Sequence, residues 1–337
     1  MLKKILIILL KILVSASLIF LLLQQKDISL NDIAVQFKTA DATWILIGIL
    51  LFTLSSILGS FQWYLLLRAR GISLPYRRAV SYYYVGLFFN NFLLGYVAGD
   101  AFRIYDISKS GGNSTDAVST VFIDRFIGFI VLTTLALLAS LLWLRHIAST
   151  ITLLMICLIF IGWAFAILLL FNQKLAKKFK WLFQFFLSEN FFAKLKEIYQ
   201  SANAFRHQKK LLLITALISI FIQGLRILVH YTAARAAHVN HIDLFYFFMF
   251  IPIVALAVSF PISIGGFGIR EQAAVNLFCL PGVGGSPEGI TSMEFMAYLI
   301  GVAGSLAGGI IFILRKKHRP QENNEFGEDM VAPELVN

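Results

Sequence analysis

The chain alternates long apolar runs with short polar segments. Six runs approach or exceed the length of about 20 residues that a helix needs to cross a bilayer. These predicted spans are residues 5–23, 44–67, 118–144, 147–171, 211–229 and 291–314. The pattern predicts an all-α, polytopic membrane protein with about six full transmembrane helices.

Two further apolar stretches, 79–99 and 244–280, are interrupted by residues that suit a membrane helix poorly. The first contains Asn90 and Asn91, and the second breaks at Val-Ser-Phe-Pro-Ile-Ser-Ile-Gly-Gly-Phe-Gly-Ile-Arg-Glu, residues 258–271. Proline removes a helical donor, and each glycine weakens a helix. Irregular backbone at membrane depth persists only where protein buries it or where it lines a wet cavity. Each stretch is therefore predicted to be a broken helical hairpin at a binding site.

Composition supports the membrane class and narrows the partners. Hydrophobic residues make up 58% of the 337 residues and charged residues only 14%, whereas soluble domains carry about 25% charged residues. The 29 Lys and Arg exceed the 18 Asp and Glu, but they cluster in loops between apolar runs. Membrane topology and anionic headgroups explain this better than nucleic acid. Cys157 and Cys279 lie in or beside apolar runs without a CxxC pair, so neither a metal site nor a disulfide framework is indicated.

The basic segments predict the topology. The N-terminus and residues 68–78, 172–210 and 315–319 are rich in Lys and Arg, which places them in the cytoplasm. The count of spans then requires 79–99 to enter and return from the cytoplasmic side, and 244–280 from the outer side. A single membrane domain, 1–315, would comprise halves of about 1–145 and 147–315 in the inverted-repeat plan of secondary transporters. The alternative is that one interrupted segment is a kinked span. A cytoplasmic tail, 316–337, is predicted to be disordered.

Charged residues at the two breaks are the candidate binding site. Ionisable residues at membrane depth usually face a cavity or a partner, although structural ion pairs near the interface are the alternative. For Asp124 and Arg125 both interpretations stay open. For Arg270 and Glu271 we favour function, because glycine amides at a helix N-terminus together with an arginine form a phosphate or carboxylate site. The predicted headgroup-binding residues are Asp100, Arg103, Asp124, Arg125, Arg226, Ser263, Gly265, Gly266, Gly268, Arg270 and Glu271.

Other chemistry is not indicated. The sequence has no Walker loop, GxSxG or HExxH motif, so no catalytic residue and no cofactor is predicted. His230, His238 and His241 lie in one predicted loop, 230–243, without a carboxylate or cysteine at ligand spacing, so no metal is predicted.

Three motifs carry a family resemblance. Gly99-Asp100-x-x-Arg103, then Asp124-Arg125, then Pro261-x-Ser263-x-Gly265-Gly266-x-Gly268-x-Arg270-Glu271 resemble the membrane region of lysylphosphatidylglycerol synthases. The resemblance covers most of 1–315. It extends to a flippase-like family in which this region occurs alone. Asp stands at 100 and 124, where the family also commonly has Glu.

The resemblance implies the lipid-translocating half of these synthases. In full-length relatives a separate soluble domain transfers lysine from aminoacyl-tRNA to phosphatidylglycerol, and the membrane region is associated with moving the product lipid between leaflets. The sequence ends at Asn337, soon after the last predicted span, so aminoacyl transfer is not expected here.

The leading hypothesis is a flippase-like protein of the inner, or cytoplasmic, cell membrane with both termini in the cytoplasm. It would translocate or handle an anionic or zwitterionic phospholipid, or a lipid-linked sugar. One alternative is an accessory subunit or membrane transferase of envelope lipid or glycolipid synthesis. A second is an ion-coupled solute transporter, for which the sequence offers no obvious coupling series of carboxylates. The expected partners are membrane lipids, with a homo-oligomer or a lipid-synthesis enzyme as further options, and no nucleic acid.

Overall fold

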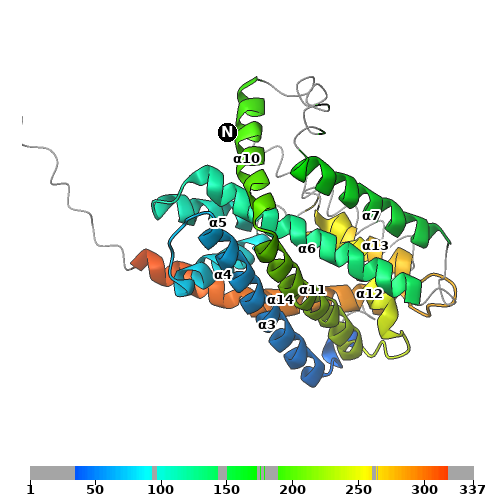
Figure 1. Cartoon of the computed structure of the whole chain (residues 1–337). Coiled ribbons are helices and arrows are strands. Elements are labelled where there is room, and N and C mark those ends of the chain that lie inside the picture. The colour runs from blue at the N-terminus through cyan, green and yellow to red at the C-terminus, as the bar shows by residue number, and fades with distance from the viewer. Residues whose placement is uncertain are drawn as a thin grey trace, which may run out of the picture.

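The structure is a computed structural model of the chain. It describes residues 35–92, 97–142, 150–172, 175, 178, 189–259, 263 and 265–317. Throughout these ranges the regular elements are helices and none is a strand (Figure 1). The predicted all-α class is confirmed. The first predicted span, 5–23, and the tail from 318 onward lie outside the described residues.

Long apolar helices confirm that this is an integral membrane protein. Four of the described helices are long and apolar enough to cross a bilayer: α3 (Ala42–Ala69), α6 (Ser114–Leu142), α11 (Lys209–Ala236) and α14 (Pro287–Lys317). A further helix, α7 (Thr150–Phe171), follows the predicted span 147–171, and its apolar stretch Cys157–Leu170 is shorter.

The predicted end of the span 211–229 is wrong. The helix α11 continues to Ala236, well past the predicted end of this span at 229. His230 therefore belongs to the helix and not to a polar loop, and its side chain faces the interior of the protein.

Each interrupted stretch is a pair of helices. The first consists of α4 (Tyr76–Phe92) and α5 (Val97–Lys109), and the second of α12 (Leu244–Ser259) and α13 (Ile269–Phe278). Where α4 and α5 cross, a Cβ atom on Gly99 would lie 1.9 Å from the carbonyl oxygen of Gly86. Only glycine permits this approach, which keeps the first hairpin tight.

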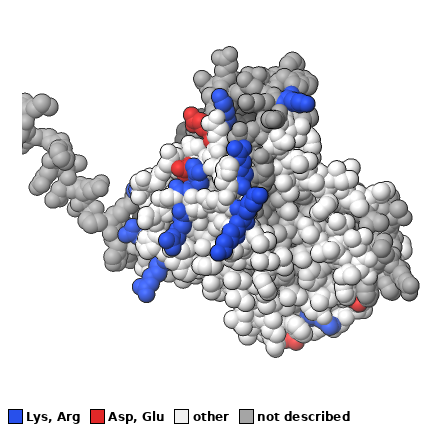
Figure 2. Space-filling model, in the orientation of Figure 1, with Lys and Arg blue, Asp and Glu red and all other residues white. Residues whose placement is uncertain are grey.

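The helices α3 and α11 form an antiparallel pair (Figure 1). At one end the Asp41 amide donates to the Ala236 carbonyl at 3.2 Å, and at the other the Gln208 side chain donates to the Ala69 carbonyl at 3.2 Å. Basic side chains gather at the second end (Figure 2). We call this the basic end and define it by Arg68, Arg70, Arg77, Arg78, Lys209, Lys210 and Arg315.

The two hairpins reach into the protein from opposite ends. At the basic end Tyr82 of α4 contacts Ser110, just after α5, at 2.8 Å, and Asp106 of α5 pairs with Arg315 at 3.1 Å. The loops flanking α12 and α13 meet at the other end, where His241 Nε2 lies 2.5 Å from the Gly284 carbonyl oxygen. The contacts of the two hairpins thus lie at opposite ends of the α3–α11 pair.

The hairpins meet beside the middle of α14. The hydroxyl of Tyr298 donates to the Asn91 carbonyl at 3.0 Å, and the Asn91 side chain donates to Ser305 at 2.8 Å. A Cβ atom on Gly308 would lie 2.0 Å from the Tyr84 carbonyl oxygen. Small residues along 301–309 therefore let α14 pack closely against α4.

Two shorter elements complete the basic end. They are α10 (Glu189–Asn203) and the 3-10 helix η2 (Ala204–His207). Ser201 of α10 donates to Asp116 at 2.7 Å, and Asp116 also forms an ion pair with Arg70. These contacts fasten α10 to the start of α6, away from the hairpins.

Candidate functional site

A cavity of about 400 Å³ lies where the two hairpins meet. Both hairpins contribute to its wall, together with α3, α6, α11 and α14. Six of the predicted site residues line it: Asp100, Arg103, Asp124, Arg125, Arg226 and Arg270. The structure thus brings together charged residues from four segments that are far apart in the sequence.

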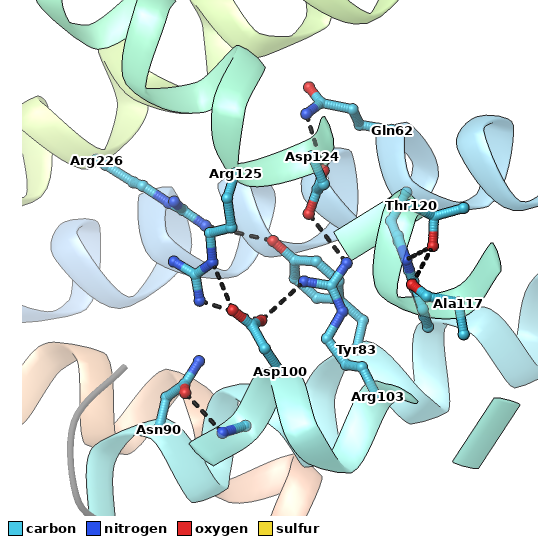
Figure 3. A network of polar contacts seen from close by, with 12 residues as sticks. Gln62, Tyr83, Asn90, Asp100, Arg103, Ala117, Thr120, Asp124, Arg125 and Arg226 are labelled. Carbon is cyan, nitrogen blue, oxygen red and sulfur yellow. Dashed lines mark hydrogen bonds and ion pairs between the residues drawn. The ribbon is translucent and has the colours of Figure 1, made fainter. Parts of the chain in front are cut away.

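Around the first hairpin these charges form one ion-paired network (Figure 3). Arg103 contacts Asp100 at 3.3 Å and Asp124 at 2.9 Å. Arg125 reaches Asp100 from the other side at 2.9 Å, and Gln62 of α3 donates to Asp124 at 2.9 Å. Each carboxylate therefore receives donors from two different residues. For Asp124 and Arg125 this supports the structural interpretation and also places both at the cavity.

The guanidinium of Arg103 is enclosed on its remaining faces. Its Cζ atom lies 4.2 Å from the ring centroid of Trp63 and 4.7 Å from that of Tyr83, and the residue is 4% exposed. Two carboxylates and two aromatic rings thus surround this cation. These contacts hold the Arg103 side chain in place as part of the cavity wall.

Arg226 of α11 has a different environment. Its Nη2 donates to the Tyr83 hydroxyl at 3.3 Å, and no carboxylate pairs with it among the described residues (Figure 3). The charged residues that line the cavity are four arginines and two aspartates. The cavity wall therefore carries an excess of positive charge, and Arg226 is a cation of this wall for which no ion pair is described.

Arg270 enters the cavity from the second hairpin, at the start of α13. The turn that aims it has left-handed backbone at Gly265, Gly266 and Gly268, with φ of 59°, 80° and 82°. A Cβ atom on Gly266 would lie 2.4 Å from Val258. Arg270 donates to the Gly265 carbonyl at 2.5 Å. Glycine is thus required here by both backbone conformation and space.

The other predicted residues of this turn lie behind the cavity wall. Glu271 is fully buried, and its Oε2 accepts the Gly268 amide at 2.7 Å. The Gly268 amide therefore donates its hydrogen bond to Glu271 and does not face the cavity. The sequence had predicted that the glycine amides of this turn would bind a headgroup. Ser263 is also buried. These residues shape the turn and set the direction of Arg270.

Two ionisable residues at the site are absent from the predicted set. Glu294 of α14 is fully buried, and its Oε1 lies 3.1 Å from Nδ1 of His230, which lines the cavity. The sequence does mark Glu294 as an acidic residue inside the apolar run 291–314, and an intramembrane carboxylate usually has a function. His230 falls in the predicted loop 230–243 because the apolar run ends at 229, whereas α11 continues to Ala236.

The remainder of the cavity wall is apolar. Its residues come mainly from α6, α11 and α12, and they include Leu132, Ile222, Ile227, Ile251, Val254 and Val258. The cavity therefore offers one charged wall and one hydrocarbon wall. Within the described ranges no group of three or more His, Cys, Asp or Glu side chains is placed to hold a metal ion.

Comparison with protein families agrees with these motifs. The family model described as the lysylphosphatidylglycerol synthase TM region matches residues 8–293, which include both hairpins and all of the predicted site residues. No curated protein matches the chain. Because the match covers most of its length, the chain belongs to the lysylphosphatidylglycerol synthase transmembrane-region family.

Proposed function

We propose that this protein moves an anionic phospholipid, or another lipid with a phosphate-bearing headgroup, between the two leaflets of the cell membrane. The headgroup would enter the central cavity while the acyl chains stay in the bilayer. The observation that carries the proposal is Arg226, a cation at the cavity wall with no described carboxylate partner. A headgroup phosphate would supply the missing negative charge.

The two walls of the cavity favour an amphiphile over a free solute. The charged wall suits a headgroup, and the apolar wall around Ile251 and Val254 suits the first carbons of the acyl chains. A site for a water-soluble ion would gain nothing from that apolar wall. Arg103 is already surrounded by two carboxylates, so Arg226 and Arg270 are the residues that we assign to the phosphate.

A single substitution tests this assignment. Arg226→Gln removes the charge and keeps a polar side chain, and we expect it to slow lipid movement by about 10- to 100-fold, the worth of one hydrogen bond to a charged group. The measurement uses proteoliposomes of phosphatidylethanolamine and phosphatidylglycerol, with tracer phosphatidylglycerol labelled on an acyl chain. Dithionite quenches the label that reaches the outer leaflet.

Arg235→Gln is the matched control. Arg235 lies on the same helix, contacts Tyr231 at 3.0 Å and does not line the cavity, so its loss should leave the rate unchanged. Movement no faster than in protein-free vesicles would contradict the proposal. Equal rates for wild type and Arg226→Gln would contradict the assigned site.

The proposed topology follows from the positions of the hairpin ends. We propose that α4–α5 enters and leaves from the cytoplasmic side and α12–α13 from the outer side, as an inverted repeat. Basic residues at the ends of the first hairpin support a cytoplasmic location, and both chain termini would lie on that side.

Cysteine labelling tests the topology. Ser114→Cys follows the first hairpin and Ser286→Cys follows the second, and both serines are exposed. In a background without Cys157 and Cys279, a membrane-impermeant maleimide should label Ser114→Cys only from the cytoplasm and Ser286→Cys only from outside. Labelling of both from the same side would refute the scheme.

A further inference from the structure

The Glu294–His230 pair is a second polar feature of the cavity, distinct from the arginines assigned to the headgroup. Glu294 is 0% exposed, and the imidazole of His230, which lies 3.1 Å away, lines the cavity with its side chain 21% exposed. The imidazole therefore lies between the buried carboxylate and the cavity. His230 is the partner described for Glu294, and its imidazole is charged only when protonated.

A second buried carboxylate lies close by. Glu271 of α13 is also 0% exposed, and the charges of Arg270 and Glu294 both act on it. One oxygen of each glutamate, Oε1 of Glu271 and Oε2 of Glu294, is buried without a hydrogen-bond partner among the described residues. Burying two like charges with incomplete hydrogen bonding is costly. A proton held by the pair of carboxylates and His230 relieves that cost.

The charged groups around this cluster are few. They are Arg270 on α13, Arg226 one turn before His230 on α11, and the network of Asp124 and Arg125 across the cavity. The other helices packed nearby add little: α12 has no charged residue, α3 has only Arg68 and α4 only Arg77 and Arg78, all at the basic end. Arginine is always protonated. Asp124 is held by Arg103 and Gln62, so His230, Glu294 and Glu271 are the side chains of this cluster that could take up a proton.

We propose that Glu294 and His230 form a proton-binding site that couples lipid movement to the proton gradient. The inference rests on the proposed function, because the coupled ligand is the headgroup phosphate. With the cavity empty, Arg270 helps to balance the negative charge of the buried glutamates. A phosphate bound to Arg270 and Arg226 competes for this positive charge, so the cluster takes up a proton.

The proton balance is simple. One proton from cavity water passes by way of the imidazole of His230 to the Glu294 carboxylate, and the imidazole is left neutral. No other bond forms or breaks. When the phosphate leaves, the proton returns to the water. By linkage, protonation and headgroup binding strengthen each other by the same factor.

Infrared spectroscopy tests the proton site without any lipid movement. In purified protein in detergent, a pH-difference spectrum should contain a carboxylic-acid C=O band that Glu294→Gln removes and His230→Gln shifts to another pH. Ser292→Ala is the matched control, because Ser292 is likewise fully buried on α14 and cannot ionise. The band should persist in that variant. A spectrum identical in wild type and Glu294→Gln would overturn the proton site, and His230→Gln gives an independent reading if Glu294→Gln does not fold.

A transport assay tests the coupling. In the labelled phosphatidylglycerol assay, an imposed pH gradient should change the wild-type rate by about fivefold or more, the low end of typical coupling energies. Glu294→Gln should not respond to the gradient, and Ser292→Ala should respond as wild type does. Wild-type movement that ignores the gradient would overturn the coupling and leave the proposed function intact. A titrating Glu294 band in a protein that moves no lipid would overturn the proposed function and leave the proton site.

Discussion

The two hairpins hold their polar residues in opposite ways. Around α4–α5, Asp100 and Arg103 are paired with residues of α6, so charge fastens the hairpin to its neighbour. Around α12–α13 the turn satisfies itself, with Glu271 capping Gly268 and Arg270 donating to the Gly265 carbonyl. The first hairpin is therefore anchored by tertiary ion pairs, and the second takes its shape from glycine backbone. Ion pairs hold the cavity wall around the first hairpin, whereas the glycine turn of the second sets the direction of Arg270.

Removal of a carboxylate from the first hairpin's network should have the largest effect on stability. Asp124→Ala leaves Arg103 buried with one partner fewer and Gln62 without its acceptor. We expect a loss of about 3–5 kcal/mol, as when one member of a buried ion pair is deleted. Denaturant unfolding in detergent micelles, followed by tryptophan fluorescence, measures the free energy.

Asp106→Ala is the control for this prediction. Its partner Arg315 is about one-third exposed, and such pairs contribute about 1 kcal/mol or less. If Asp106→Ala and Asp124→Ala lose equal stability, the first hairpin is not anchored by its buried charges.

A methyl group in the glycine turn tests the second hairpin. Gly266→Ala forces a left-handed conformation, which costs about 1–2 kcal/mol, and its Cβ meets Val258, which adds about 1–3 kcal/mol of overpacking. Gly282→Ala shares the positive φ but meets nothing within 4 Å, so only the first cost applies. Thermal unfolding measures the decrease in melting temperature of each variant relative to wild type, and we expect the larger decrease for Gly266→Ala. Equal decreases would show that the contact with Val258 does not constrain the turn.

The smallest expected effect is at the contact between the hairpins and α14. Tyr298→Phe removes the hydrogen bond to the Asn91 carbonyl and should cost about 1 kcal/mol. Tyr105→Phe provides the control, because Tyr105 is exposed and no hydrogen bond to it is described. Denaturant unfolding in detergent micelles measures the free energy of unfolding of both variants. A Tyr298→Phe protein as stable as wild type would show that this hydrogen bond does not hold the hairpin.

Much of the fold could be predicted because a bilayer imposes a length. Runs of about 20 apolar residues identify α3, α6, α11 and α14. Asn90 and Asn91 identify the first break, and proline and glycine identify the second. The end of α11 was missed, because polar residues such as His230 resemble a loop when their tertiary partners are unknown. Glu294 was overlooked for the opposite reason, since one carboxylate hardly alters the mean hydropathy of a long apolar run.

Eleven residues are predicted for the candidate site, seven of them charged, and six of these charged residues line one cavity. Glu271, Ser263 and the three glycines do not line it. Which charges pair with which could not be predicted. Asp124 contacts Gln62, 62 residues away, and His230 contacts Glu294, 64 residues away. Ion pairing depends on distances of a few ångströms, whereas hydropathy and motif spacing report only local chain properties.

The sequence by itself thus determined the membrane class, the two broken hairpins and the family motifs, because these depend on local composition and backbone chemistry. Only the tertiary structure decided that Arg103 is enclosed by carboxylates, that Arg226 has no described ion pair, and that Glu294 meets His230 at the cavity. The physical reason is that the partners of a buried charge determine whether it stabilises the fold or is left to bind a ligand. In this fold those partners come from helices far apart in the chain.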